Sequence, residues 1–258
     1  HSAGARPAIE KSNTMRKTLL TLSFLALLAG CSEPQTKNPE IRTKNIEYTN
    51  ATPLEEGSPH SFEMKMDIEW PEAGLKPEAL KKMQLGVTEL LFESECTTTD
   101  IDFAIATYDR HSADHYRSVN DSEYVEEEWG FMLDWSEYIK GSFLPEHDGM
   151  ISYTRYISGY SGGAHGMDHL TARIFSLKSG EVITEEDLFK PGYIPTLTKA
   201  LRDNLLESFE KIELLWDTEI DPSDDYYITP EGITYIYQRY DISSYAMGII
   251  KITVPWDE

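Results

Sequence analysis

The chain is poor in cysteine, in positive charge and in long apolar segments. Two cysteines among 258 residues exclude the class of small secreted domains that are stabilised by several disulfides. The 23 basic residues face 45 acidic ones, and the formal charge of −22 argues against nucleic acid as a partner. The apolar run over residues 18–29 is about half as long as a helix that spans a bilayer. Stability must therefore come from a hydrophobic core.

The short apolar run belongs to a signal for export and lipid attachment. It follows Met15 and two basic residues, and it ends in Leu-Ala-Gly-Cys at residues 28–31. This motif resembles the lipoprotein box of bacteria, and the resemblance implies cleavage before Cys31 and acylation of that residue. We therefore predict upstream or cloning-derived residues over 1–14, a signal peptide over 15–30 and a lipid bilayer as the partner of acylated Cys31.

Cleavage before Cys31 makes the mature chain still more acidic, with 19 basic and 44 acidic residues and a charge of −25. Ser32 follows the lipidated cysteine in place of a retention aspartate, which favours an outer membrane, facing the periplasm or the cell surface. Cys96 has no intramolecular disulfide partner once Cys31 is acylated, and its place after an apolar helical stripe predicts a buried, inert thiol.

Periodicity predicts the fold class. Residues 31–59 are polar and predict a flexible tether, whereas alternation over 62–68, ended by Pro71, predicts a strand. Apolar residues at helical spacing predict helices over 77–94 and 197–215, and residues 101–117 also favour a helix. Further strands are expected within 129–140, 150–157, 170–177, 226–229, 233–238 and 249–254, and Thr184 with Asp187 resembles a capping box. This order predicts an α+β fold of two closely associated subdomains, with antiparallel sheets and helices packed on one face.

A glycine-rich segment between two predicted strands is the candidate ligand loop, and it comprises Tyr160, Ser161, Gly162, Gly163, His165 and Gly166. Consecutive glycines let backbone N–H groups approach one another or a ligand, and the imidazole can lock the turn through hydrogen bonds. We therefore interpret the loop as a backbone scaffold that also offers a cradle for an anion or a sugar hydroxyl.

Catalytic interpretations of the same loop, with Ser161 as nucleophile or with zinc, stay open. Residues 160–163 resemble the serine loop of chymotrypsin-like proteases, although Tyr160 stands where those have an acidic residue. The pattern Gly-x-Ser-x-Gly at 159–163 matches a serine nucleophile elbow, but the predicted context is strand to strand and no histidine follows His169. Alternatively, His165, Asp168 and His169 could hold zinc, although a strand would separate the two histidines by about 13 Å. We predict no metal and no cofactor, and we name these three residues as the ligands if a metal is bound.

Several segments together resemble the DUF3298 domain, and they lie at 160–166, 175–180, 188–189, 227–233 and 240–248. The resemblance covers residues 157–258, and residues 60–156 resemble the DUF4163 module that commonly precedes it. It implies an α+β ectodomain in a cell-envelope context. Similar domains form the extracellular part of the anti-sigma-V factor, which senses lysozyme by binding it, and accompany the catalytic domain of some peptidoglycan deacetylases.

These observations predict a membrane-anchored cell-envelope lipoprotein whose ectodomain binds a ligand and is not an enzyme. A lysozyme-like basic protein or peptidoglycan is the expected partner, since the negative charge would steer a cationic protein. Four tyrosines are candidates for stacking on sugars, namely Tyr226, Tyr227, Tyr235 and Tyr237. The alternative is a zinc- or serine-dependent hydrolase that acts on envelope polymers.

Overall fold

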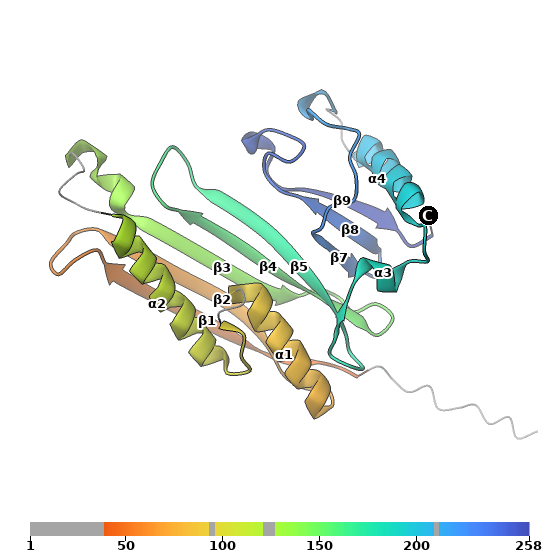
Figure 1. The fold of residues 1–258 in the computed structure, drawn as a ribbon, viewed down its shortest axis with the longest axis horizontal. Coiled ribbons are helices and arrows are strands. Elements are labelled where there is room, and N and C mark those ends of the chain that lie inside the picture. Colours follow the sequence, from red (N-terminus) through yellow and green to blue (C-terminus); the bar gives the residue numbers. More distant parts are fainter. Residues whose placement is uncertain (1–38, 93–95, 121–126, 209–211, 258) are drawn as a thin grey trace, which may run out of the picture. The chain divides into compact units, whose positions relative to one another are not determined.

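Two β-sheets and the helices that cover them form the part of the chain that the structure describes (Figure 1). This computed structural model describes residues 39–92, 96–120, 127–208 and 212–257. One sheet has six strands in the order β1 to β6, and the other has three, in the order β7-β8-β9. Among the described residues no helix is both long and apolar enough to cross a membrane. The α+β fold class is confirmed.

The six-stranded sheet follows the chain order from one edge to the other. Its strands are β1 (Arg42–Pro53), β2 (Ser61–Ala73), β3 (Trp135–Phe143), β4 (Met150–Tyr160), β5 (Met167–Ser176) and β6 (Val182–Ile183). All neighbours are antiparallel except β2 and β3, so the sheet is mixed and not purely antiparallel as expected. A parallel pair requires a long crossover, and the helices α1 and α2 lie in that connection.

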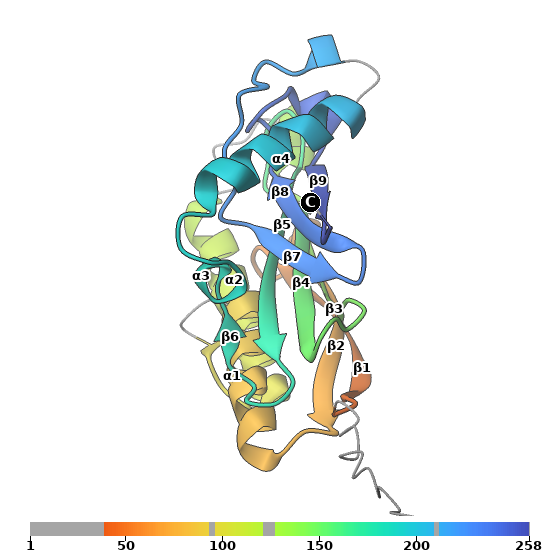
Figure 2. The same cartoon turned by 90° about the vertical axis from the view of Figure 1, so that its right-hand side faces the viewer.

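Helices α1 (Pro77–Phe92) and α2 (Ile101–Val119) cover one face of this sheet, as Figures 1 and 2 show. Their apolar stripes meet the side chains that β2, β3, β4 and β5 direct to that face. Buried Met83 and Leu91 of α1 belong to the same core as Ile139, Tyr153 and Phe175 of the sheet. Asp100 caps α2, because its side chain accepts a hydrogen bond from the backbone N–H of Phe103.

A second core lies on the other face of the six-stranded sheet. It is built from α4 (Ile194–Ser208) and the strands β7 (Tyr226–Thr229), β8 (Gly232–Tyr237) and β9 (Ile250–Pro255), preceded by the capped turn α3 (Glu185–Leu188). Ser152 of β4 joins the two sheets, because its hydroxyl donates to the backbone oxygen of Ile228 and accepts from the nitrogen of Ile228. Ser152 neighbours Tyr153 along the strand, so the two side chains point to opposite faces.

The predicted tether and the predicted domain boundary are wrong where the structure describes them. Residues 42–53, within the expected tether 31–59, form the edge strand β1 and pair with β2 along its whole length. Only Ile46 and Tyr48 of β1 pack against the first core, so the sequence shows little alternation. The boundary between 156 and 157 falls inside β4, a central strand, so the chain does not divide there.

Other predicted elements have different limits in the structure. Pro71 does not end β2, because it lies opposite Thr43 next to a register irregularity and the strand continues to Ala73. The expected strand from residue 129 begins only at Trp135, after the 3-10 helix η3 (Glu127–Leu133). Cys96 is buried as predicted. The signal peptide, Cys31 and residues 209–211 of the expected second helix lie outside the described residues.

Candidate functional site

The glycine-rich loop connects β4 to β5, and close backbone contacts explain its glycines. A Cβ atom on Gly159 would lie 2.6 Å from the backbone oxygen of Ser136, and one on Gly166 would lie 2.7 Å from the oxygen of Gly159. Gly162 and Gly163 have φ angles of +81° and +99°, which disfavour other residues. The predicted scaffold role of these glycines therefore has a direct steric basis.

The polar side chains of this loop hold its own backbone. The Tyr160 hydroxyl donates to the oxygen of Gly163 at 2.9 Å, and His165 Nδ1 lies 3.0 Å from the oxygen of Gly166. Ser161 is exposed, and its hydroxyl makes no hydrogen bond to another described residue. The loop is open to solvent, which leaves these groups accessible to a ligand.

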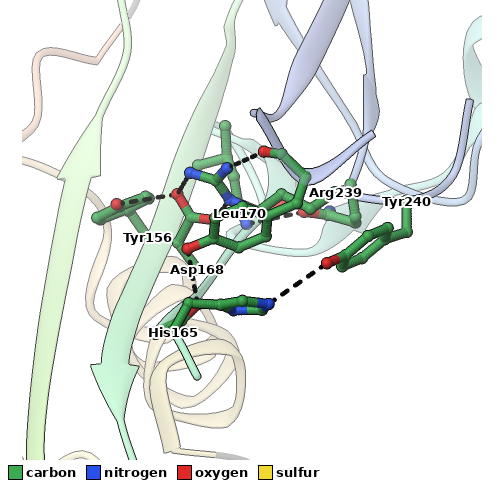
Figure 3. Close-up of polar contacts among 9 residues, drawn as sticks. Tyr156, His165, Asp168, Leu170, Arg239 and Tyr240 are labelled. Carbon is green, nitrogen blue, oxygen red and sulfur yellow. Dashed lines mark hydrogen bonds and ion pairs between the residues drawn. The ribbon is translucent and has the colours of Figure 1, made fainter. Parts of the chain in front are cut away.

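Asp168, the middle residue of the zinc alternative, is engaged by a guanidinium group (Figure 3). Arg239 donates from Nε to Oδ1 and from Nη2 to Oδ2, the latter at 3.0 Å, and the Tyr156 hydroxyl donates to Oδ2 at 3.3 Å. The side chains of Asp168 and Arg239 are only 14% and 19% exposed. Hydrogen bonding and charge from Arg239 lower the pKa of the Asp168 carboxyl, although burial opposes this shift.

The three candidate zinc ligands are not brought together. Asp168 points to Arg239, while His165 lies against Tyr245 and its Nε2 is 3.5 Å from the Tyr240 hydroxyl (Figure 3). Within the described ranges, no group of three or more histidine, cysteine or acidic side chains is close enough to hold a metal ion. The structure instead places the glycine-rich loop in a hydrogen-bonded assembly with the segment that follows β8.

Four aromatic side chains form a continuous row beside the loop, and we call His165, Tyr245, Tyr240 and Trp216 the aromatic row. Successive ring centroids are 4.1, 5.9 and 6.5 Å apart, and the last pair is nearly parallel at 10°. Trp216 and Tyr240 are 57% and 48% exposed. The Arg239 guanidinium stacks on the Tyr245 ring, 4.3 Å from its centroid, and so stabilises the position of that ring in the row.

Tyr240 has a backbone conformation that is unusual for its residue type. Its φ angle is +71°, a left-handed value shared by one other non-glycine among the described residues, Asp148. The conformation is held by Asp241, whose carboxylate accepts from the nitrogen of Gln238 at 2.6 Å. Backbone strain of this kind costs about 1–3 kcal/mol and concentrates at functional sites. The strain therefore marks the aromatic row as a candidate binding surface.

A cavity of about 420 Å³ with several hydroxyl groups in its lining adjoins the aromatic row, and we call it the hydroxyl groove. It lies on the face of the six-stranded sheet that faces away from α1 and α2, where alternate residues of β3 and β4 point. Its lining includes Lys65, Ser136, Tyr138, Tyr156, Ser158, Arg239 and Tyr245. Tyr245 belongs to both features, and Arg239, which stacks on Tyr245, lines the groove, so the row and the groove form one surface.

Sequence reasoning identified the loop but missed most of this surface. Tyr240 and Tyr245 were part of the family resemblance without a role, while Arg239 and Trp216 carried no local signal. Of the four tyrosines proposed for sugar stacking, Tyr235 and Tyr237 are buried in the second core. All residues of β8, the middle strand of the three-stranded sheet, are buried. The Tyr235 hydroxyl donates to the Glu185 carboxylate, and the Tyr237 hydroxyl donates to the backbone oxygen of Asp221.

Comparisons with known proteins agree with the architecture. Residues 186–257 match the family "Protein of unknown function (DUF3298)", and residues 15–32 match the prokaryotic membrane lipoprotein lipid attachment site. The family match begins after the glycine-rich loop and covers α4 and β7–β9, a shorter stretch than the expected 157–258. No curated protein sequence matches this chain.

Two solved structures share the fold. One is a DUF3298 family member from Bacteroides fragilis NCTC 9343, with a TM-score of 0.76, 19% identity and coverage of 85% of this chain and 92% of that one. The other is a DUF3298 family protein from Pseudomonas aeruginosa PAO1, with a TM-score of 0.60, 18% identity and coverage of 85% and 93%. The chain therefore carries a DUF3298 domain and a lipoprotein attachment site, which make it a lipid-anchored protein of the cell envelope.

Proposed function

We propose that this lipoprotein recognises a glycan of the cell envelope, with peptidoglycan as the leading candidate, and does so without catalysis. The observation that carries the proposal is the strained, exposed Tyr240 in the aromatic row. Aromatic rings pack against the apolar faces of sugars, and a strained residue persists when the surrounding structure holds it for a purpose.

The hydroxyl groove supplies the second half of such a site. Sugar hydroxyls need several converging donors and acceptors, and Tyr138, Tyr156, Ser136 and Ser158 line the cavity together with Lys65. The groove adjoins the row through Tyr245, so a sugar stacked on the row would have hydrogen-bonding partners nearby. Recognition rather than hydrolysis is further supported by the pairing of Asp168 with Arg239 and by the lack of a base bonded to Ser161 among the described residues.

Replacing Tyr240 with glycine is the sharpest test of this site. We expect binding of N-acetylglucosamine tetramer and of purified peptidoglycan to weaken at least about tenfold, because a stacking ring is lost. The free energy of unfolding should not fall by more than about 1 kcal/mol, because relief of the backbone strain at positive φ offsets the loss of ring contacts. Isothermal titration, co-sedimentation with peptidoglycan and chemical denaturation measure these effects, using the chain with Cys31→Ser to avoid detergent.

Asp148→Gly is the matched control for Tyr240→Gly. It removes the other non-glycine residue with positive φ, in the turn between β3 and β4, away from the aromatic row. Glycan binding should be unchanged in this variant. Unchanged binding in both Tyr240→Gly and Trp216→Ala would show that the aromatic row is not the glycan site.

A lysozyme-like basic protein is a second candidate ligand, and the charge of the chain favours it. The formal charge of −22 over the full sequence would accelerate association with a cationic partner and make that association sensitive to salt. Titration with hen lysozyme at low and moderate salt is the test. Retention that falls steeply with salt supports this partner, and the absence of heat at low salt removes it.

A further inference from the structure

A second cavity, of about 620 Å³, opens on the opposite face of the sheet from the hydroxyl groove. We call it the histidine groove. One wall is α2, which contributes Tyr108, His111, Ser112 and His115, and the floor includes Phe62, Trp135, Glu137 and Ile157. Met167 and His169 of β5 line the other side. Ile157 alternates with Tyr156 and Ser158 along β4, so the two cavities open on different faces of one sheet. They meet at the strand ends, where both are lined by Ser136, Glu137, Gly159, Met167 and Asp168.

The lining of the histidine groove combines an apolar floor with a rim of imidazoles. Trp135 contacts the adjacent rings of His115 and Tyr116 on α2, with centroid distances of 6.1 and 5.5 Å, which positions it in the floor. Three of the seven histidines of the chain line this one cavity. Neutral imidazole already offers an N–H donor, and protonated imidazole offers two. The rim is therefore a concentration of donors in an otherwise acidic protein.

Two carboxylates, those of Glu137 and Asp168, belong to the lining of the groove. Asp168 is bonded to Arg239, as described above. Burial raises the pKa of the Tyr108 hydroxyl, Glu137 adds to that shift and Arg155 opposes it, so the Glu137 carboxylate and the Arg155 guanidinium both lie close to Tyr108. At the rim, Arg110 Nη2 lies 3.4 Å from His111 Nε2 and adds positive charge.

We propose that the histidine groove binds an amphipathic carboxylate, a small molecule with an apolar or aromatic body and one acidic group. The body would pack on Trp135 and Ile157, and the carboxylate would accept hydrogen bonds from the imidazoles at the rim. Pockets of about 300–1,000 Å³ with apolar lining and a few polar groups are typical of small-molecule sites. This site is distinct from the proposed glycan site, because the histidines and Trp135 that define it line the histidine groove and not the hydroxyl groove.

1-Naphthylacetate and its neutral amide, 1-naphthylacetamide, form a matched pair of probes. In isothermal titration of the chain with Cys31→Ser, we expect the acid to bind at least about tenfold more tightly than the amide, since hydrogen bonds to a charged acceptor are stronger. His169→Gln, at an exposed rim position, should weaken binding of the acid by about tenfold and leave the affinity for the amide unchanged. Ser112→Trp, which fills the groove from α2, should abolish binding of both.

His147→Gln is the control, because His147 stacks on Trp256 at 4.8 Å and does not line the groove. Its affinity for the acid should equal that of the parent chain. Equal affinity for acid and amide, or failure of both to bind, would overturn the proposal. Unchanged binding of the acid in a folded His169→Gln variant would do the same, as would unchanged binding in a folded Ser112→Trp variant.

Discussion

Arg239→Ala is expected to lower the free energy of unfolding by about 3 kcal/mol, because it leaves the Asp168 carboxylate largely buried without its charged partner. The guanidinium also donates to the backbone oxygen of Tyr245 and stacks on the Tyr245 ring, so the variant loses contacts that hold the aromatic row. Chemical denaturation measures the loss. Glycan affinity should fall as well, because Tyr245 and Tyr240 are no longer positioned.

The control for Arg239→Ala is Lys199→Ala, which breaks an exposed ion pair with Asp203 one helical turn away in α4. Such pairs contribute about 0.5 kcal/mol or less. Arg239→Lys keeps the charge but cannot bond both carboxylate oxygens in a planar fork, so its stability should lie between those of the parent chain and Arg239→Ala. A loss in Arg239→Ala no larger than in Lys199→Ala would contradict this account of the pair.

The ion pair of Asp168 with Arg239 should make the free energy of unfolding fall as the pH becomes acidic. Because Arg239 lowers the pKa of the folded Asp168 carboxyl, the stabilisation is fully present above the unfolded pKa of about 3.9 and is lost as pH falls through the folded value. The difference in unfolding free energy between the parent chain and Arg239→Ala should therefore be constant near neutral pH and shrink below about pH 4. An equal difference at pH 7 and at pH 3 would contradict it.

Gly159→Ala is expected to destabilise the protein by about 3 kcal/mol, because its Cβ would collide with backbone and not with a movable side chain. Gly163→Ala should cost only about 1 kcal/mol, since φ is positive there but no atom lies within 4 Å of the new Cβ. Thermal or chemical unfolding of the two variants compares a packing constraint with a purely conformational one. Equal costs would mean that the contact of Gly159 with Ser136 does not constrain the loop.

Gly163→Ala also tests the loop as a binding element. The substitution places a methyl group at the solvent-facing tip without touching the rest of the protein. Glycan binding that falls in Gly163→Ala, with the fold intact, would extend the site from the aromatic row to the loop tip. Unchanged binding would confine the loop to its scaffold role.

Local features of the sequence determined the lipid anchoring in the cell envelope and the fold class. A lipoprotein motif is contiguous, and the amphipathic stripes of α1 and α4 repeat at helical spacing, so both were predictable without tertiary context. The capping box at Thr184 and Asp187 is likewise local, and it is present. The edge strand β1 was not predicted because it buries little apolar surface. It is ordered by its pairing with β2, which the sequence pattern does not encode.

The candidate site was decided by the tertiary structure. Arg239 and Asp168 are 71 residues apart, and only the packing of the second core on the six-stranded sheet brings them together. The same packing aligns Tyr240 and Tyr245 with His165 and buries Tyr235, although all three tyrosines look alike in sequence. A residue's exposure and its long-range partners depend on which faces meet, and periodicity predicts that a face exists but not what will cover it.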